Sequence, residues 1–270
     1  MVKTIREAKL GKIELRLVEK DGRYFGVANG PNGYRVQVEG GTADEAWRLL
    51  HDEAGKGSAN YFGFDGARAR LLHFFPNGFH SAGYEDEERN YKVKAKTALD
   101  RGAPVEAAAS GSGYGEPVLA AFRATNMLFR VEKARLQEAM RGPNADRFIR
   151  AAARFALGEG ASALAEMEAA LRPHEIAKWI VVTYLPFLWR PDAHMFLKPE
   201  VTKDFAERVG HTYAARYEPR LDIGVYDSLL DLAARTETEI AELEPRDRID
   251  LQSFIWVVGD YKEGQQEPRP

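Results

Sequence analysis

The sequence contains no cysteine. A disulfide framework, a cysteine-ligated zinc site and a thiolate nucleophile are therefore excluded. The absence of cysteine fits a reducing compartment. Residues 1–17 also lack the continuous apolar stretch of a secretory signal. We therefore expect an intracellular, cytoplasmic protein.

Long hydrophobic runs are missing as well. The dense apolar segment Phe254–Val258 is far shorter than the roughly 20 residues that a membrane-spanning helix needs, so no membrane partner is expected. The net charge is −3, whereas proteins that bind nucleic acid non-specifically usually carry a clear basic excess. Any contact with nucleic acid must therefore come from a local basic patch. Hydrophobic residues make up 44% of the chain, which is enough for a packed core.

The first part of the chain has the pattern of strands. Lys12–Leu17 and Tyr34–Val38 alternate apolar and polar residues, as half-buried strands do. Asp21-Gly22 is a strong hairpin-turn signal, and Arg23–Ala28 follows it as the return strand. These segments predict an antiparallel β-meander with one apolar face. A further strand is expected at Arg70–Phe75.

A helix is expected to cover that apolar face. Thr42 and Glu45 form a capping box at its start. The apolar positions that follow have helical spacing: Ala46, Trp47, Leu49, Leu50 and Ala54. We expect Trp47 to close the meander.

Most of the remaining chain has helical periodicity. Glu85–Leu99 has acids in its first turn and lysines later, as the helix dipole favours. One long helix ending at Gly142-Pro143 is predicted from apolar residues spaced by four and seven: Val118, Phe122, Phe129, Leu136 and Met140. The segment Pro245–Val258 is expected to end in a buried helix.

These elements predict an α+β fold, because the strands precede the helices rather than alternating with them. The expected organisation is a β-rich α+β domain that begins with the antiparallel β-meander and its covering helix (1–102), a Gly-, Ala- and Ser-rich linker (103–115), an all-α helical domain (116–262) and a flexible tail (263–270).

Aromatic and cationic residues are interleaved in one stretch of the first part. Its members are Phe79, His80, Arg89, Tyr91, Lys92, Lys94 and Lys96. Such side chains can stack on bases and contact phosphates, so we treat them as a candidate nucleic-acid-binding site. The alternative is a solvated helix, because the acids at 85–88 would repel a polyanion.

A second cluster, at residues 184–203, combines charged residues with prolines and aromatics. Within it, His194 is a candidate general base that Asp192 would orient, which makes these two the candidate catalytic residues. Arg190 and Lys198 are candidate anion-binding residues. The alternative is a connector that packs its apolar residues inward while its charges pair at the surface.

Metal and cofactor chemistry is not indicated. None of the six histidines lies in an HxH, HxxxH or HExxH pattern. Ser110–Gly115 precedes a helix but lacks the lysine of a phosphate-binding P-loop. We therefore expect no metal and no cofactor.

Residues 245–257, Pro-Arg-Asp-Arg-Ile-Asp-Leu-Gln-Ser-Phe-Ile-Trp-Val, resemble a segment found in uncharacterised bacterial proteins and in modification-dependent restriction proteins of the McrB type. The likeness covers thirteen residues and brings no catalytic residue with it. What it implies is DNA-associated bacterial biology.

The sequence leaves three hypotheses for function open. The first is a bacterial-type, non-enzymatic nucleic-acid-associated binding or regulatory protein, with DNA or RNA as its partner. The second is an enzyme or small-anion-binding protein centred on Arg190, Asp192, His194 and Lys198. The third is an interaction domain for a protein partner.

Overall fold

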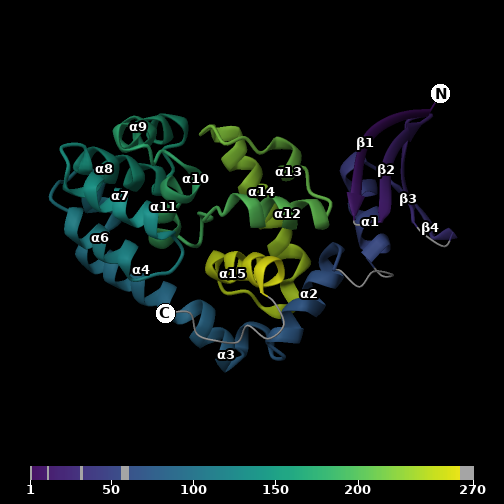
Figure 1. Cartoon of the computed structure of the whole chain (residues 1–270), viewed down its shortest axis with the longest axis horizontal. Helices are drawn as coiled ribbons and strands as arrows, with labels where there is room; N and C mark the ends of the chain where they lie inside the picture. The colour runs from purple at the N-terminus through teal and green to yellow at the C-terminus, as the bar shows by residue number, and fades with distance from the viewer. Residues whose placement is uncertain (1, 11, 31–32, 56–60, 262–270) are drawn as a thin grey trace.

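Four antiparallel strands open the chain. The computed structural model describes residues 2–10, 12–30, 33–55 and 61–261. The strands β1 (Val2–Leu10), β2 (Ile13–Lys20), β3 (Arg23–Asn29) and β4 (Arg35–Gly40) lie side by side in sequence order, as Figure 1 shows. The expected meander is confirmed. Strand β1 was not among the expected strands, and a register shift between Thr4 and Arg6 interrupts its alternation.

The turn between β2 and β3 has the expected geometry. Asp21 and Gly22 both have positive φ angles, 52° and 76°, so that Lys20 pairs directly with Arg23. This is the two-residue turn that matches the twist of the flanking strands. The register places Leu15 and Leu17 on the buried face of the sheet.

Helix α1 (Ala43–Gly55) covers that face, as predicted. The backbone N–H of Glu45 donates to Thr42 Oγ1 over 3.1 Å, and the N–H of Gly41 donates to Glu45 Oε2 over 2.7 Å. Trp47 is buried between helix and sheet. Gly26 allows this close approach, because a Cβ at that position would lie 2.8 Å from Leu50 Cβ.

Helices and short connections make up the rest of the described structure. The prediction of a strand at 70–75 is wrong. Helix α2 (Gly63–Phe74) includes most of that segment and buries Phe64, Ala67 and Leu71 at helical spacing. The helices that follow are α3 (Ala82–Tyr84), a π-helical turn η3 (Glu85–Arg89), α4 (Asn90–Gly102), α5 (Val105–Ala108), α6 (Gly115–Arg123), α7 (Arg130–Arg141), α8 (Ala145–Ala156), α9 (Ala161–Leu171), α10 (Trp179–Val182), α11 (Tyr184–Trp189), α12 (Pro199–Arg208), α13 (Tyr213–Arg216), α14 (Ile223–Glu239) and α15 (Arg248–Asp260). Three short 3₁₀ turns, Gly78–His80, Arg172–His174 and Ala241–Leu243, join some of them.

The long helix expected over 118–140 is interrupted. Residues 124–129 separate α6 from α7, and the two helices pack against each other as a hairpin. Phe129, expected on the apolar face of that long helix, is instead 66% exposed just before α7 begins. The spacing that suggested one apolar face therefore joins residues from two helices.

Two hydrophobic cores meet near residue 63. The smaller core lies between the sheet and α1 and extends to Phe62, whereas the larger one begins at Phe64 and extends to Val258. The segment 103–115, expected to be a linker, contains α5 and contributes Ala103, Val105 and Ala108 to the larger core. The expected tail, 263–270, lies outside the described residues.

Helix α1 also connects the sheet to the helical region. Asp52 accepts a hydrogen bond from the backbone N–H of Phe64 over 3.2 Å. Gly63 has a φ of +67°, and a Cβ there would lie 2.8 Å from Asp52 Cα. On the same turn of α1, His51 Nδ1 donates to the carbonyl of Arg208 over 3.0 Å, and His51 Nε2 is buried without a partner among the described residues.

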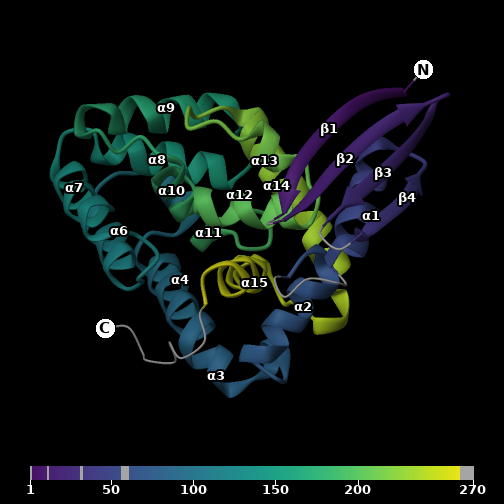
Figure 2. The same ribbon diagram turned by 45° about the vertical axis from the view of Figure 1, so that its right-hand side comes forward.

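Helix α15 occupies the middle of the helical region. It packs against α2, α12 and α14 and against the π-helical turn, and Figure 2 shows it surrounded by the other helices. In the described part of the chain, no helix combines the length and the apolar character needed to cross a membrane.

The burial of His51 should make stability depend on pH. Burial lowers the pKa of His51 to about 4, whereas an exposed histidine titrates near 6.5. Between these values the unfolded chain binds a proton that the native protein does not, so the native state loses stability as the pH falls, by about 1.4 kcal/mol per unit. From pH 6.5 to pH 5, His51 should contribute a loss of about 2 kcal/mol.

Urea unfolding at pH 7 and pH 5 should test this, with His51→Gln beside the wild type. The variant should lose about 2 kcal/mol less than the wild type over that interval. Equal losses for the two proteins would show that His51 is not held neutral at the junction.

Candidate functional site

The predicted nucleic-acid-binding residues lie in different environments. Phe79 is fully buried and packs edge-on against Tyr84. Tyr91 packs against the larger core, whereas His80 is exposed with its Nε2 3.2 Å from Glu244 Oε2. Lys96 donates to Asp100 Oδ2 and to the carbonyl of Trp189. Lys94 is exposed on α4.

Arg89 is bound inside the protein by two acids of the C-terminal segment. It forms a two-pronged pair with Asp247, over 2.9 and 2.8 Å, and donates to Asp250 Oδ1 over 2.8 Å. Asp250 has no exposed surface. It also accepts hydrogen bonds from the hydroxyl of Tyr84 over 2.6 Å and from Arg246 Nε over 2.9 Å.

The protonation state of Asp250 follows from these donors. Burial alone would raise its pKa, but hydrogen bonds from Arg246 and Tyr84, together with the charge of Arg89, lower the pKa of Asp250 below its ordinary value. The carboxylate is therefore ionised. Because it compensates the charge of Arg89, that charge is not displayed to a polyanion.

Lys92 forms a second buried contact with α15, the helix that carries Asp250. Its side chain is 1% exposed, and Nζ donates to Glu88 Oε2 over 3.0 Å and to Ser253 Oγ over 2.7 Å. Burial lowers the pKa of Lys92, and the charge of Glu88 opposes that shift. The other oxygen of Glu88 accepts from the hydroxyl of Tyr261 over 2.7 Å. Lys92 thus holds α4 against α15.

The second predicted cluster does not converge on one site. Arg190 and Asp192 pair with each other at the surface over 2.9 Å, which lowers the pKa of Asp192. His194 is buried elsewhere, with Nδ1 2.9 Å from the hydroxyl of Tyr226 and Nε2 3.1 Å from the carbonyl of Ala156.

These contacts determine the tautomer of His194. Nε2 faces a carbonyl, so it carries the hydrogen, and Nδ1 accepts from Tyr226. Burial lowers the pKa of His194 to about 4. Its acceptor nitrogen is thus occupied, and in this arrangement His194 supports the loop after α11 rather than facing a substrate.

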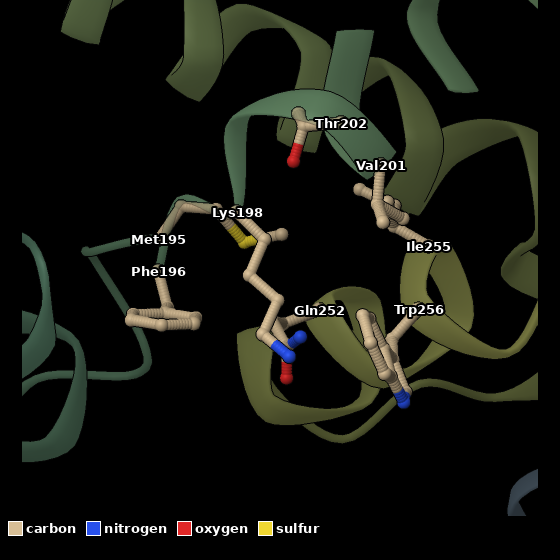
Figure 3. A pocket seen from close by; sticks show the side chains of 8 residues that line it. All are labelled: Met195, Phe196, Lys198, Val201, Thr202, Gln252, Ile255 and Trp256. Carbon is tan, nitrogen blue, oxygen red and sulfur yellow. The ribbon is translucent and has the colours of Figure 1, made fainter. Parts of the chain in front are cut away.

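Lys198 lies in a small cleft between the loop before α12 and the helix α15. Its Nζ is 3.5 Å from the centre of the Trp256 ring. The cleft has an open volume of about 200 Å³, and its interior has room for about one water molecule. Figure 3 shows the side chains that line it: Met195, Phe196, Lys198, Val201, Thr202, Gln252, Ile255 and Trp256.

The structure exposes a group of neighbouring residues that the sequence patterns did not predict, which we call the Phe129 patch. It comprises Arg123, Phe129, Arg130, Val131 and Lys133 at the α6–α7 hairpin, where Phe129 and Val131 are each 66% exposed. The cation Arg130 directly after Phe129 was a possible sequence signal of this patch. The apolar spacing instead assigned Phe129 to the buried face of a helix.

Metal binding has no geometric support in the described ranges, where no three histidine or acidic side chains gather as ligands. Comparison of the chain with known protein families, with curated proteins and with solved structures finds no match.

Removal of the Asp250 carboxylate should be strongly destabilising. Asp250→Ala leaves the Tyr84 hydroxyl and part of two guanidinium groups without an acceptor, so we expect a loss of about 3–5 kcal/mol in the free energy of unfolding. Asp192→Ala breaks an exposed pair and should cost at most about 1 kcal/mol. Urea denaturation of both variants at pH 7 provides the measurement.

Asp250→Asn keeps the shape of the side chain and serves if the alanine variant does not fold. Its loss should lie between those of the other two variants. If Asp250→Ala cost no more than Asp192→Ala, the buried carboxylate would not hold the helices together.

Proposed function

We propose that this chain is a non-enzymatic, nucleic-acid-associated binding protein that contacts single-stranded nucleic acid through the Phe129 patch. The observation that carries the proposal is an aromatic ring, 66% exposed, that lies within six residues of Arg123, Arg130 and Lys133 along the α6–α7 hairpin. The resemblance of residues 245–257 to modification-dependent restriction proteins points in the same direction.

The partners of Arg123 and Lys133 leave their charges uncancelled, and partial burial lowers the pKa of Lys133. Arg123 donates to the amide oxygen of Gln137 over 3.0 Å, and Lys133 donates to the backbone carbonyl of Thr125. Both acceptors are neutral, so neither charge is cancelled by its partner. This differs from Arg89 and Lys92, which face buried carboxylates.

The start of α7 adds to this potential. Arg130 is exposed in the first turn, where the helix dipole also favours an anion. Glu132 is the acid of that turn, and one of its carboxylate oxygens is buried. Arg130 and Lys133 outnumber Glu132 near this end of the helix, so its net charge is basic.

The pairing of α4 with α6 supports an extension of the patch by one residue of the predicted cluster, Lys94. Gly102 at its end lies against Pro117 near the start of α6, where a Cβ would be 2.9 Å from Pro117 Cβ. Helices α4 and α6 pack together with the end of α4 beside the start of α6. Lys94, in the first half of α4, and Arg123, at the end of α6, therefore lie toward the other end of this helix pair. Lys94 is thus the member of the predicted cluster best placed to extend the patch.

The single strand is favoured over the duplex by the chemistry of the ring. Bases of a single strand expose their flat faces, and an exposed aromatic side chain can stack on them whatever the sequence. In a duplex those faces are covered by neighbouring base pairs. The three cations would meanwhile contact the phosphates on either side of the stacked base.

A fluorescently labelled single-stranded oligonucleotide should bind the protein in anisotropy titrations at low ionic strength. Phe129→Ala should weaken binding about 5- to 150-fold, because one base–aromatic stack is worth about 1–3 kcal/mol. Leu157→Ala, which truncates an exposed side chain between α8 and α9, is the matched control and should bind like the wild type.

The salt dependence tests the role of the cations. With three phosphate contacts, the logarithm of the binding constant should fall against the logarithm of salt concentration with a slope of about −2. Arg130→Ala should reduce that slope by about 0.7. A flat titration at low ionic strength, or equal binding by Phe129→Ala and Leu157→Ala, would exclude this function for the patch.

A further inference from the structure

The cleft beside Trp256 contains a polar group that the described part of the protein does not satisfy. Gln252 is 6% exposed, and its Oε1 is buried without a hydrogen-bond donor among the described residues. Such an unpaired acceptor is costly, and in native structures such a group usually pairs with a water molecule, an ion or a ligand. Figure 3 shows the Gln252 amide directed into the cleft, between Phe196 and Trp256.

Two other residues that line the cleft, Trp256 and Thr202, can also interact favourably with a cationic hydrogen-bond donor. The face of the Trp256 ring already carries a cation, the Lys198 ammonium at 3.5 Å, and the ring quadrupole attracts such groups. Thr202 contributes a hydroxyl, which can accept a hydrogen bond. Lys198 is the charged residue of the lining, so a second cation meets no repulsion from the lining once that ammonium moves away.

We propose that this cleft is a recognition site for an aliphatic ammonium group, and that the ammonium of Lys198 occupies it in the structure described here. An incoming amine would take the place of Lys198 over Trp256 and donate a hydrogen bond to Gln252 Oε1. The site is distinct from the Phe129 patch and does not depend on nucleic-acid binding. Since the described residues that line the cleft include no carboxylate, a single small amine should bind weakly.

The length of lysine suggests the test. Lys198→Ala removes three carbons and the ammonium, which together correspond to propylammonium. Added propylammonium chloride should fill that space, so at about ten times its dissociation constant it should raise the melting temperature of Lys198→Ala by about 3 °C over equal sodium chloride. The wild type should respond less, because Lys198 competes for the same ring.

Three controls separate the cleft from general effects of an amine. Lys203 also lies over an aromatic ring, with Nζ 5.0 Å from the centre of Tyr217, but it does not line the cleft. Lys203→Ala should therefore gain no response to propylammonium. Lys198→Met keeps the cleft filled and should gain none. Propan-1-ol, the neutral analogue, should not reproduce the shift in Lys198→Ala.

Gln252 provides the last discriminating measurement. In the Lys198→Ala background, Gln252→Leu should reduce or abolish the shift produced by propylammonium, because it removes the acceptor while keeping a similar volume. The proposal is overturned if Lys198→Ala responds no more than the wild type, if propan-1-ol acts equally, or if Lys203→Ala responds as strongly.

Discussion

Asp250 has no contact with solvent, and its carboxylate accepts hydrogen bonds from Tyr84, Arg89 and Arg246. A buried carboxylate is tolerated only where donors and positive charge surround it. This requirement determines where α15 can lie against residues 84–89. Because α15 also packs on α2, α12 and α14, one buried charge constrains the arrangement of the helical region.

Helix α15 has one set of residues that holds neighbouring elements in place and another set that lines the cleft. Asp247, Asp250 and Ser253 recur every three residues and face the π-helical turn and α4. Gln252 and Trp256, four residues apart, face the cleft. The charged contacts that fix the rotation of α15 about its axis therefore also fix the direction in which Gln252 and Trp256 point.

The elements could be predicted from the sequence where the signal is local. The alternation in β2 and β4, the Asp21-Gly22 turn and the capping box at Thr42 each involve residues within a few positions of one another, so the meander and its covering helix were predicted. Helix α2 was not, because Leu71 and the aromatics after it also resemble a short buried strand. The break before Phe129 was missed because apolar spacing continues across it.

The candidate sites were harder to predict for a physical reason. Arg89 and Lys92 have the composition of a phosphate-binding surface, and their partners on α15 lie about 160 residues further along the chain. Glu88, four residues before Lys92, signals a local ion pair, but the nearby sequence does not distinguish a buried pair from an exposed one. Of the second cluster, Lys198 lies in a cleft whose other polar group, Gln252, comes from a distant helix.

This separation along the chain has a consequence for synthesis. A ribosome completes residues 84–92 long before it reaches Asp247, Asp250 and Ser253, so a growing chain carries Arg89 and Lys92 without the α15 partners that they contact in the native protein. Those cations cannot be buried at low cost until α15 has emerged. The sheet with α1, whose contacts are local, can form early, whereas the contacts of Arg89 and Lys92 must wait for α15.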